Sequence, residues 1–366
     1  MDSSLFDYQI PDELIAQHPV TRRDESRLLL VDRDSGRISH HEFSEFPDLL
    51  PARSAIFRND VSVLKARLRG LRPGGGSVEC LLLQPETRTD GIWWCLLRPG
   101  RRFRPGATFG HPGEFDAEVL QKSPGGEFKV QFRSSRGEKS SVEGIAERVG
   151  EVPLPPYIRR HNDLRQSLDD AERYQTVYAD PGKKWAAAAP TAGFHFTEDV
   201  LSDLERREIP VYDLTLRIGL GTFRPISDET VESHTIHTER YWIPAETRRA
   251  MAGDDARQSV AVGTTAVRAI EDFARKTAYP EFGGTSGTND EYSSDTSLFI
   301  YPPAEFRMTD NLLTNFHLPR STLMCLVAAF LTPGEIHGIN WLKEIYLQAI
   351  RFNYRFFSYG DAMLIR

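Results

Sequence analysis

A proline-rich hexapeptide, Val152–Tyr157, separates two regions of the chain whose residue patterns differ. Before it, short alternating runs such as Ser77–Leu83, Gly91–Leu97 and Phe128–Phe132 are separated by glycine- and proline-rich turns. Strands at such short intervals, with no helical period between them, are typical of a small β-barrel or sandwich. Because prolines stiffen a segment, the hexapeptide is a natural exit from this β-rich region.

After the hexapeptide, predicted strands alternate with predicted helices, which is the pattern of an α/β layered domain. Helices are expected after a cap at Thr197, after Gly263 and around Ile339–Ile350, and strands at Val211–Leu216, Ser259–Val262 and Leu298–Tyr301. Residues 1–60 supply the first strand and helix of the same domain. We therefore expect a discontinuous core domain of residues 1–60 and 151–366 and an inserted β domain of residues 61–150. The polar tract Lys276–Thr296 is expected to be a surface loop.

The composition excludes several classes of protein. Hydrophobic residues make up 40% of the 366, which suits a sizeable core and not a disordered chain. The longest nearly apolar run, Thr322–Leu331, is about half as long as a membrane helix. Three distant cysteines (Cys80, Cys95, Cys325) indicate neither a disulfide framework nor a zinc cluster. Asp2 stands where a secretory signal would be basic. We expect a cytoplasmic monomer with no membrane span.

Charge is distributed unevenly along the chain. The net charge is −7, which argues against a protein that wraps nucleic acid over its whole surface. Between Arg53 and Arg104, however, eleven basic residues face only four acidic ones. The simplest interpretation of such a run is a solvent-exposed surface. In an acidic protein, however, it is also the region where a polyanion would bind.

The standard nucleotide and metal motifs are incomplete. Gly219–Arg224 begins like a dinucleotide-binding loop but has Arg224 in place of the third glycine, and Pro181–Lys184 lacks the first glycine and the hydroxyl residue of a P-loop. His234, His237 and Glu239 match no zinc spacing, so we expect a hydrogen-bonding cluster and no metal there.

Several segments combine small residues, which let a backbone approach a ligand closely, with isolated polar ones. They are 188–196, 219–223, 262–268, 314–319 and 358–363. Each alone is equally well a turn or a helix cap. In α/β folds, loops that follow strands assemble binding sites, and a helix start such as Gly263-Thr264-Thr265 suits a carboxylate or phosphate. The residues by themselves indicate a ligand-binding α/β enzyme.

Taken in order, these segments resemble the S-adenosylmethionine:tRNA ribosyltransferase-isomerase family of queuosine biosynthesis. The resemblance covers essentially the whole chain, and the strings TNFHLPRSTL and RFFSYGDAM are its most specific parts. The matching strings are PDELIAQHP (11–19), ERYQTVYA (172–179), AAPTAGFHF (188–196), GLGTFRPI (219–226), AVGTTAVRAIE (261–271), LFIYPP (298–303), TNFHLPRSTLMCLVAAF (314–330) and YRFFSYGDAM (354–363), together with His234, His237 and Glu239.

The resemblance implies an α/β core that is barrel-like, with an inserted small β-barrel. It implies transfer and isomerisation of the ribosyl moiety of S-adenosylmethionine onto 7-aminomethyl-7-deazaguanine in a queuosine-type tRNA anticodon. Adenine and methionine leave, giving epoxyqueuosine-tRNA, and no metal takes part. Loss of a C5′ proton beside the sulfonium requires a general base.

The resemblance also implies roles for particular residues. His195, His317 and Asp361 are the expected catalytic side chains, and Arg98, Arg101, Arg102 and Arg104 the expected RNA-binding ones. The expected substrate-binding residues are Asn59, Asp60, Arg67, Thr191, Gly193, Gly219, Gly221, Thr222, His234, His237, Glu239, Gly263, Thr264, Thr265, Arg268, Asn315 and Tyr359.

The chain departs from the family pattern close to the expected substrate positions. Val61 and Ser62 replace a hydroxyl and a basic residue, and Arg217 and Leu220 replace a histidine and an alanine. Two other functions therefore stay open. One is an S-adenosylmethionine-dependent relative acting on another nucleoside, and the other is a non-catalytic tRNA-binding relative.

Overall fold

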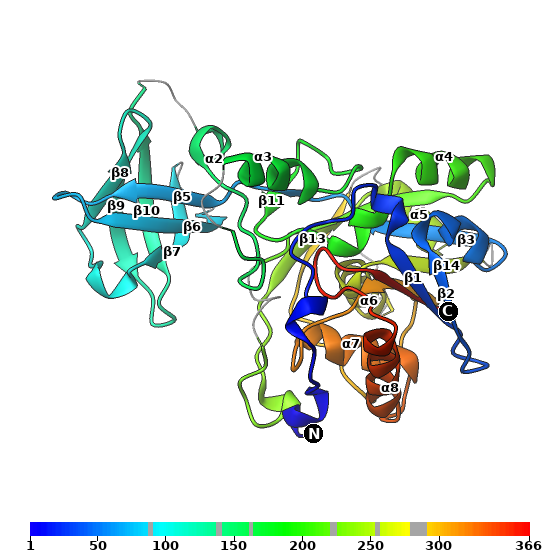
Figure 1. Ribbon diagram of the computed structural model, residues 1–366. Helices are drawn as coiled ribbons and strands as arrows, with labels where there is room; N and C mark the ends of the chain where they lie inside the picture. The colour runs from blue at the N-terminus through cyan, green and yellow to red at the C-terminus, as the bar shows by residue number, and fades with distance from the viewer. Residues whose placement is uncertain (87–90, 137–140, 161–163, 220–224, 253–256, 279–290) are drawn as a thin grey trace.

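A computed structural model of the chain describes residues 1–366 except 87–90, 137–140, 161–163, 220–224, 253–256 and 279–290, and only the backbone of 164–168. It contains a large mixed sheet with helices on both faces and, beside it, a closed β-barrel (Figure 1). The expected α/β core with an inserted β-barrel is confirmed.

The large sheet has nine strands, and its centre is parallel. β12 pairs with β3, β3 with β14 and β14 with β16, all in parallel, whereas β13, β15 and β2 add antiparallel pairs at the two sides. The order is β15 (Tyr292–Thr296), β13 (Glu239–Ile243), β12 (Val211–Leu216), β3 (Ser54–Asn59), β14 (Gln258–Val262), β16 (Asn311–Asn315), β17 (Ala362–Ile365), β1 (Arg27–Val31) and β2 (Ile38–Glu42).

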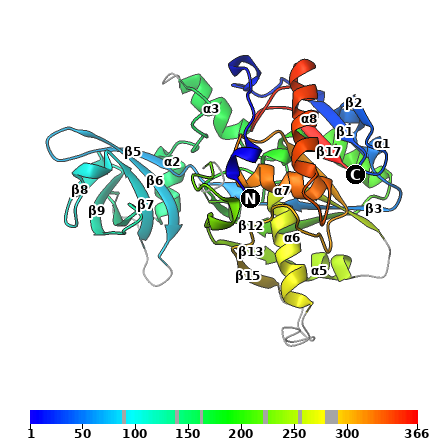
Figure 2. The same cartoon turned by 90° about the horizontal axis from the view of Figure 1, so that it is seen from below.

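Both faces of the sheet are buried at its inner strands, which carry apolar residues at consecutive positions, whereas the edge strands β2 and β15 are more polar and partly exposed. In β1, Leu29 and Val31 pack on one side and Leu28 and Leu30 on the other. The first side is covered by α6 (Thr264–Thr277), α7 (Thr322–Leu331) and α8 (Gly338–Arg351), and the second by α1 (Phe46–Leu49) and α4 (Glu198–Arg206). Figures 1 and 2 show these layers.

Local sequence signals explain where several helices begin. The hydroxyl of Thr197 accepts a hydrogen bond from the N–H of Val200 and so caps α4, as predicted. Ser321 caps α7 in the same way through the N–H of Met324. α7 is apolar on nearly every side and accordingly almost wholly buried. No helix in the described part of the chain is long and apolar enough to cross a membrane.

The barrel has a hydrophobic core of its own. Cluster residues run from Leu64 to Ala146 and include Cys80, Cys95 and Phe115. Helix α2 (Val142–Val149) packs against β5. The strands are, around the barrel, β10 (Phe128–Ser134), β7 (Ile92–Arg98), β6 (Ser77–Pro85), β5 (Arg67–Leu71), β8 (Thr108–His111) and β9 (Phe115–Lys122).

Short elements join the barrel to the core. β4 (Ser62–Val63) pairs in parallel with β11 (Lys184–Ala186) beside the large sheet. The guanidinium of Arg217, which follows β12, donates to the carbonyls of Trp185 (3.0 Å) and of Leu83 in β6 (3.2 Å).

The remaining described elements are α3 (Leu164–Arg173), α5 (Ala245–Ala252) and the 3-10 turns η1 (Ser3–Phe6), η2 (Asp12–Leu14), η3 (Arg23–Glu25), η4 (Phe43–Glu45), η5 (Gly100–Arg102), η6 (Thr191–His195) and η8 (Val231–Ser233).

Two expectations near residue 300 are wrong. Leu298–Tyr301 is not a strand, because its polar groups are taken elsewhere: Leu298 donates its N–H to Thr296 Oγ1 and accepts from Arg268 Nε, and two prolines follow Tyr301. The strand is instead β15, at the end of the tract expected to be a loop, whose residues 279–290 lie outside the described part of the chain. It lies at the edge of the sheet, where its polar side chains are tolerated.

Candidate active site

A pocket lies where β12, β14 and β16 end at the carboxyl edge of the sheet, as expected for a parallel α/β arrangement. We call it the strand-end pocket. Ile218 follows β12, Gly263 follows β14 and His317 follows β16. Its polar lining consists of Tyr157, Thr191, Thr264, Thr265, Thr314, Asn315, His317 and Ser358.

The start of α6 forms one wall of this pocket. Gly263 has φ +87°, a conformation that side-chain-bearing residues rarely adopt, and its N–H donates to the Leu313 carbonyl. This turn places Thr264 and Thr265 in the lining. The pocket therefore contains the positive end of a buried helix together with two threonines.

A hydrogen-bonded chain behind the pocket fixes the orientation of Asn315. The hydroxyl of Ser26 donates to the carbonyl of Arg23, so it accepts from Nδ1 of His195, 2.6 Å away. Nε2 of His195 is then the acceptor for the Asn315 amide nitrogen at 3.3 Å, and Asn315 Oδ1 accepts from Thr191 Oγ1 at 2.7 Å. His195 is buried, and burial lowers its pKa to about 3, so its ring is neutral.

His317 is the histidine that lines the pocket. Its Nε2 lies 2.8 Å from Thr314 Oγ1, and its backbone is held by the hydroxyls of Tyr346 and Tyr8. Burial lowers the pKa of His317 to about 3. The Thr314 hydroxyl also lies 3.4 Å from the Asn315 carbonyl. When Thr314 donates there, His317 donates from Nε2 and keeps a lone pair on Nδ1.

A second pocket adjoins the first, and Leu323 lines both. We call it the histidine pocket, because His234 and His237 line it together with Asp228, Glu239 and Arg268. Nδ1 of His234 lies 3.0 Å from Asp228. Glu239 and Arg268 form a buried ion pair, and the other Glu239 oxygen accepts from the Gly219 N–H at 2.8 Å. His234, His237 and Glu239 line the same pocket, but these hydrogen bonds of His234 and Glu239 go to other described residues and not to one another.

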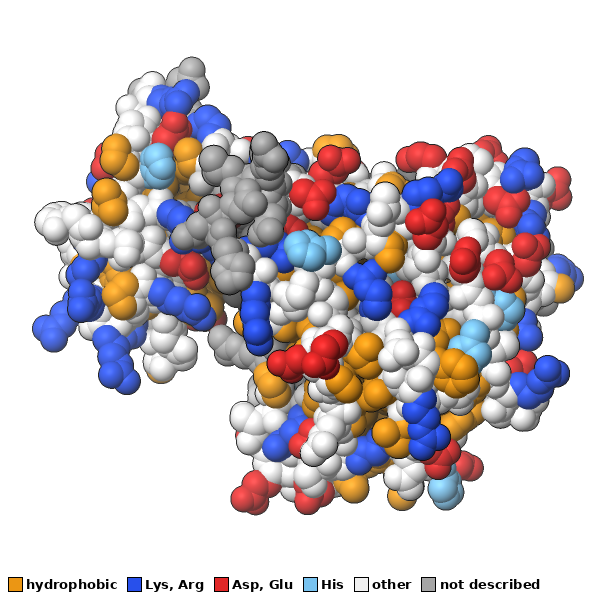
Figure 3. All heavy atoms as spheres, viewed as in Figure 1, with side chains coloured by type: hydrophobic (Ala, Val, Ile, Leu, Met, Phe, Trp, Pro, Cys, Tyr) orange, Lys and Arg blue, Asp and Glu red, His pale blue; other side chains and the backbone are white. Residues whose placement is uncertain are grey.

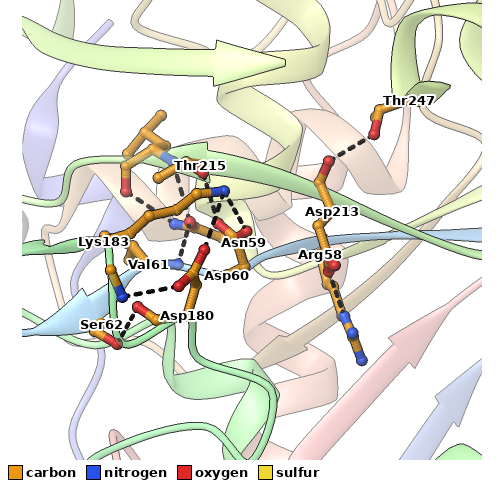
Figure 4. A network of polar contacts seen from close by, with 12 residues as sticks. Arg58, Asn59, Asp60, Val61, Ser62, Asp180, Lys183, Asp213, Thr215 and Thr247 are labelled. Carbon is orange, nitrogen blue, oxygen red and sulfur yellow. Dashed lines mark hydrogen bonds and ion pairs between the residues drawn. The ribbon is translucent and has the colours of Figure 1, made fainter. Parts of the chain in front are cut away.

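Asn59 and Asp60 lie behind the sheet edge in a hydrogen-bond network (Figure 4), and Asn59 Nδ2 also donates to Oγ1 of the pocket residue Thr265 at 3.4 Å. Asn59 bonds both the N–H and the carbonyl of Leu216, which ties β3 to β12. Asp60 accepts from Thr215 Oγ1 and from Lys183 Nζ, each at 2.6 Å, and burial raises its pKa. Neither side chain lines the strand-end pocket.

Asp361 and Tyr359 also point away from the strand-end pocket. The buried Asp361 carboxylate accepts from the N–H groups of Arg27 (3.1 Å) and Arg355 (2.8 Å) and pairs with the Arg27 side chain at 3.3 Å. Tyr359 donates to Asp170 at 2.9 Å. Both residues hold the segment that precedes β17.

Gly193 and Arg67, which were also expected to bind substrate, instead contact other parts of the protein. A Cβ on Gly193 would lie 2.0 Å from Tyr178 Oη, so only glycine fits there. Arg67 is in the barrel strand β5, and its Nη2 donates to the Leu154 carbonyl at 3.2 Å. Gly221 and Thr222 lie outside the described residues.

The four expected RNA-binding arginines are exposed at one end of the barrel. They are Arg98, Arg101, Arg102 and Arg104, and none of them pairs with an acidic side chain in the part of the chain that the structure describes. Other members of the basic run are neutralised: Arg58 pairs with Asp213 and Arg69 with Glu151. Figure 3 shows basic side chains at the lower edge of the barrel, on the left.

Sequence reasoning does not single out Tyr157 and Ser358, whose hydroxyls lie 2.6 Å apart at the pocket wall. Ser358 is within the string YRFFSYGDAM, which could have indicated it. Tyr157 ends the proline-rich hexapeptide, which the sequence pattern indicates only as a linker. Among the described residues, no group of three histidine, cysteine, aspartate or glutamate side chains could hold a metal ion.

Comparisons with known proteins agree along the whole length of the chain. The model of the family described as queuosine biosynthesis protein matches residues 3–365. S-adenosylmethionine:tRNA ribosyltransferase-isomerase of Rubrobacter xylanophilus is 43% identical over all of this chain and 98% of that protein. The enzyme of Thermotoga maritima is 41% identical over the full length of both. A crystal structure of S-adenosylmethionine tRNA ribosyltransferase from Thermotoga maritima aligns with 99% of this chain and 100% of that chain at a TM-score of 0.52 and 32% identity.

Proposed function

The chain belongs to the queuosine biosynthesis protein family, and on that premise we propose that it transfers and isomerises the ribosyl moiety of S-adenosylmethionine onto 7-aminomethyl-7-deazaguanine in tRNA. The product is epoxyqueuosine-tRNA, and adenine and methionine leave. One observation carries the proposal: segments 188–196, 261–271 and 314–330, which carry the family motifs, contribute Thr191, Thr264 and His317 to one pocket.

The chemistry requires a proton acceptor in that pocket. A base removes the C5′ proton next to the sulfonium, and the amine of the tRNA base forms a carbon–nitrogen bond to the sugar and loses one proton. The sugar ring opens and recloses through a carbon–carbon bond, and its oxygen is kept as the epoxide. The bonds to sulfur and adenine break, methionine leaves as the neutral thioether, and adenine takes up one of the two protons. We assign the acceptor to His317, because it is the histidine that lines the strand-end pocket and it keeps an unshared electron pair on Nδ1 when Thr314 accepts from Nε2. Thr314 holds the ring through Nε2.

His195 and Asp361 have different roles in this proposal. His195 is a positioning residue, because it acts through Asn315 and does not line the strand-end pocket. Asp361 stabilises the segment between Arg355 and β17, which includes the pocket residue Ser358. The Thr264 hydroxyl is left for the nucleoside as donor or acceptor. The Thr191 hydroxyl, which donates to Asn315, can only accept from the substrate, and the Thr265 hydroxyl, which accepts from Asn59, can still donate.

The remaining parts of the proposal concern domains and partners. Residues 1–60 and 151–366 form the catalytic domain, and residues 61–150 the inserted domain that presents Arg98, Arg101, Arg102 and Arg104 to a queuosine-type tRNA. The protein acts as a cytoplasmic monomer on tRNA and S-adenosylmethionine, without a metal.

The test is adenine release from S-adenosylmethionine, measured with tRNA bearing 7-aminomethyl-7-deazaguanine and with the same tRNA bearing guanine. Release only with the modified tRNA is expected. His317→Gln should lower kcat at least about 100-fold, the range that general-base catalysis supplies. His337→Gln, an exposed control, should leave kcat unchanged.

Other outcomes would replace the proposal with one of its alternatives. Binding of S-adenosylmethionine without any response to the modified tRNA would indicate a relative that acts on another nucleoside. Salt-sensitive tRNA binding without adenine release would indicate a non-catalytic tRNA-binding protein.

A further inference from the structure

The guanidinium of Arg268 carries a hydrogen-bond donor that none of the described residues uses. Arg268 lies on α6, is 6% exposed and lines the histidine pocket. Its Nη1 pairs with Glu239, and its Nε donates to the Leu298 carbonyl at 3.1 Å. Nη2 is buried and has no hydrogen-bond partner among the described residues. An unmade hydrogen bond at a buried charged group is costly, so this donor calls for an acceptor that the described residues do not supply and that a bound ligand can provide.

The guanidinium is held in place before any ligand arrives. Glu239 is itself fixed, because its second oxygen accepts from the Gly219 N–H. Two of the three guanidinium nitrogens are thus anchored to protein groups, and little side-chain freedom remains to be lost when a ligand binds. Such a fixed planar donor suits the oxygen of a carboxylate.

The position of Arg268 relates it to the strand-end pocket. Thr264 and Arg268 are four residues apart on one face of α6, which separates them by about 6 Å along the helix axis. Thr264 lines the strand-end pocket, Arg268 lines the histidine pocket, and Leu323 borders both. A ligand with its nucleoside in the first pocket can therefore extend a short chain into the second.

The charges in the histidine pocket favour a single carboxylate over a phosphate. Glu239 already offsets the positive charge of Arg268, and Asp228 adds a further acidic group to the lining. A phosphate dianion would face these two carboxylates and receive hydrogen bonds from the two N–H groups of Nη2, whereas a carboxylate carries less charge and needs fewer donors.

We propose that Nη2 of Arg268 binds the carboxylate of the methionine moiety of S-adenosylmethionine. This inference rests on the proposed function, which supplies the ligand. It leaves the start of α6, at Gly263, Thr264 and Thr265, to the nucleoside. Arg268 thereby selects donors that carry an intact amino-acid end.

The experiment compares S-adenosylmethionine with its decarboxylated analogue, which lacks only the carboxylate. Affinities are measured by calorimetry in the presence of tRNA bearing guanine, which cannot react, and kcat/KM for adenine release is measured with the modified tRNA. The unaltered protein should prefer S-adenosylmethionine by about 10- to 100-fold, the range of one charge-assisted hydrogen bond. Arg268→Lys, which keeps a cation beside Glu239, should reduce this preference to less than about threefold by weakening S-adenosylmethionine alone.

Arg275→Lys is the matched control, since Arg275 pairs with the buried Glu271 on the same helix and lines neither pocket. It should keep the full preference. If Arg268→Lys does not fold, Arg268→Gln takes its place.

Three results would overturn the inference. Equal weakening of both ligands by Arg268→Lys would make Arg268 a structural residue only, and an unaltered protein that does not distinguish the ligands would exclude a carboxylate site. In both cases adenine release with modified tRNA would persist, so the proposed function would stand. Absence of both binding and release in the unaltered protein would overturn the proposed function and this inference with it.

Discussion

Nε2 of His195 lies 3.3 Å from the amide nitrogen of Asn315, and Ser26 fixes this nitrogen of the ring as an acceptor. His195 therefore determines which way the Asn315 amide faces at the pocket wall. A glutamine at 195 can offer an acceptor near the Nε2 position, whereas an asparagine can replace only the Nδ1 donor.

We predict that His195→Gln keeps kcat/KM within about tenfold of the unaltered protein. His195→Asn leaves an Asn315 N–H unpaired, which costs about 1–3 kcal/mol and corresponds to a loss of roughly 5- to 150-fold. Adenine release at several S-adenosylmethionine concentrations measures both variants. Equal losses in the two variants, or a pH–rate profile that His195→Gln shifts, would contradict a purely positioning role.

The two buried histidines should make stability depend on pH. The pKa of His195 and of His317 falls from 6.5 to about 3 on folding, so between these values the unfolded chain binds protons that the folded chain does not. The free energy of unfolding should therefore decrease as the pH falls below 6.5, by about 1.4 kcal/mol per pH unit for each histidine. Urea unfolding at pH 7.5, 6 and 5 measures this slope.

His195→Gln removes one of the two histidines and should lower the slope of the free energy of unfolding against pH by about 1.4 kcal/mol per pH unit. This change in slope does not depend on how stable the variant is at pH 7.5. His337→Gln, at an exposed position, is the control and should leave the slope unchanged. Parallel curves for the unaltered protein and His195→Gln would show that His195 is not held neutral.

Lys183 pairs with the buried Asp60 at 2.6 Å (Figure 4). Lys183→Met would leave a buried carboxylate without its cation and should destabilise the protein by about 2 kcal/mol. This is less than the roughly 3–5 kcal/mol of a fully buried pair, because the Lys183 side chain is 21% exposed. The double variant Asp60→Asn with Lys183→Met should recover part of the loss in urea unfolding. Additive losses would mean that the pair is not coupled.

Much of the architecture could be predicted from the sequence because local and tertiary preferences agree there. β12 occupies the predicted Val211–Leu216, and α4 begins after the predicted cap at Thr197. β15 could not be predicted, since its sequence Tyr-Ser-Ser-Asp-Thr carries no apolar period and this edge strand exists only because β13 offers a partner.

The sequence could predict which segments form the site, but not which of their side chains face the pocket. Spacing indicated that 188–196 and 314–319 meet at strand ends, and Thr191 and Asn315 do lie 2.7 Å apart. It could not show that His195 turns inward to Ser26 while His317 faces the pocket, because that choice depends on packing between distant segments. Asp361 was expected to be catalytic. The sequence could not show that its carboxylate oxygens instead accept from two backbone N–H groups, because those contacts also depend on how distant segments pack.

Arg217, where the family pattern has histidine, joins the core to the barrel through the carbonyls of Trp185 and Leu83. Burial lowers its pKa to about 10, so it stays charged at pH 7. The histidine of Arg217→His is too short to keep both hydrogen bonds, which should cost about 1–3 kcal/mol of stability. Because the barrel is then held less firmly to the core, the distribution of interatomic distances from X-ray scattering should broaden. Arg240→His, on an exposed site of β13, is the control. An unchanged distribution would show that Arg217 does not fix the barrel.

The exposed arginines of the barrel provide the last prediction. Arg98, Arg101, Arg102 and Arg104 have no acidic partner among the described residues, so their charge is available to phosphates. Removal of one arginine–phosphate ion pair lowers the slope of log affinity against log salt by about 0.7–0.9. Reversal of three, Arg101→Glu with Arg102→Glu and Arg104→Glu, should therefore weaken tRNA binding at least tenfold at low salt and flatten the slope by about two.

The matched control changes the net charge equally at exposed arginines of the core domain, Arg37→Glu with Arg249→Glu and Arg351→Glu. If tRNA is held at the barrel, the control should retain most of its affinity and its salt slope, because interactions between exposed charges are screened beyond about 10 Å at 0.1 M salt. Filter binding across a range of salt concentrations measures both proteins. Equal weakening in the two would mean that only the overall charge matters, and unaltered binding in the barrel variant would place the tRNA elsewhere on the surface.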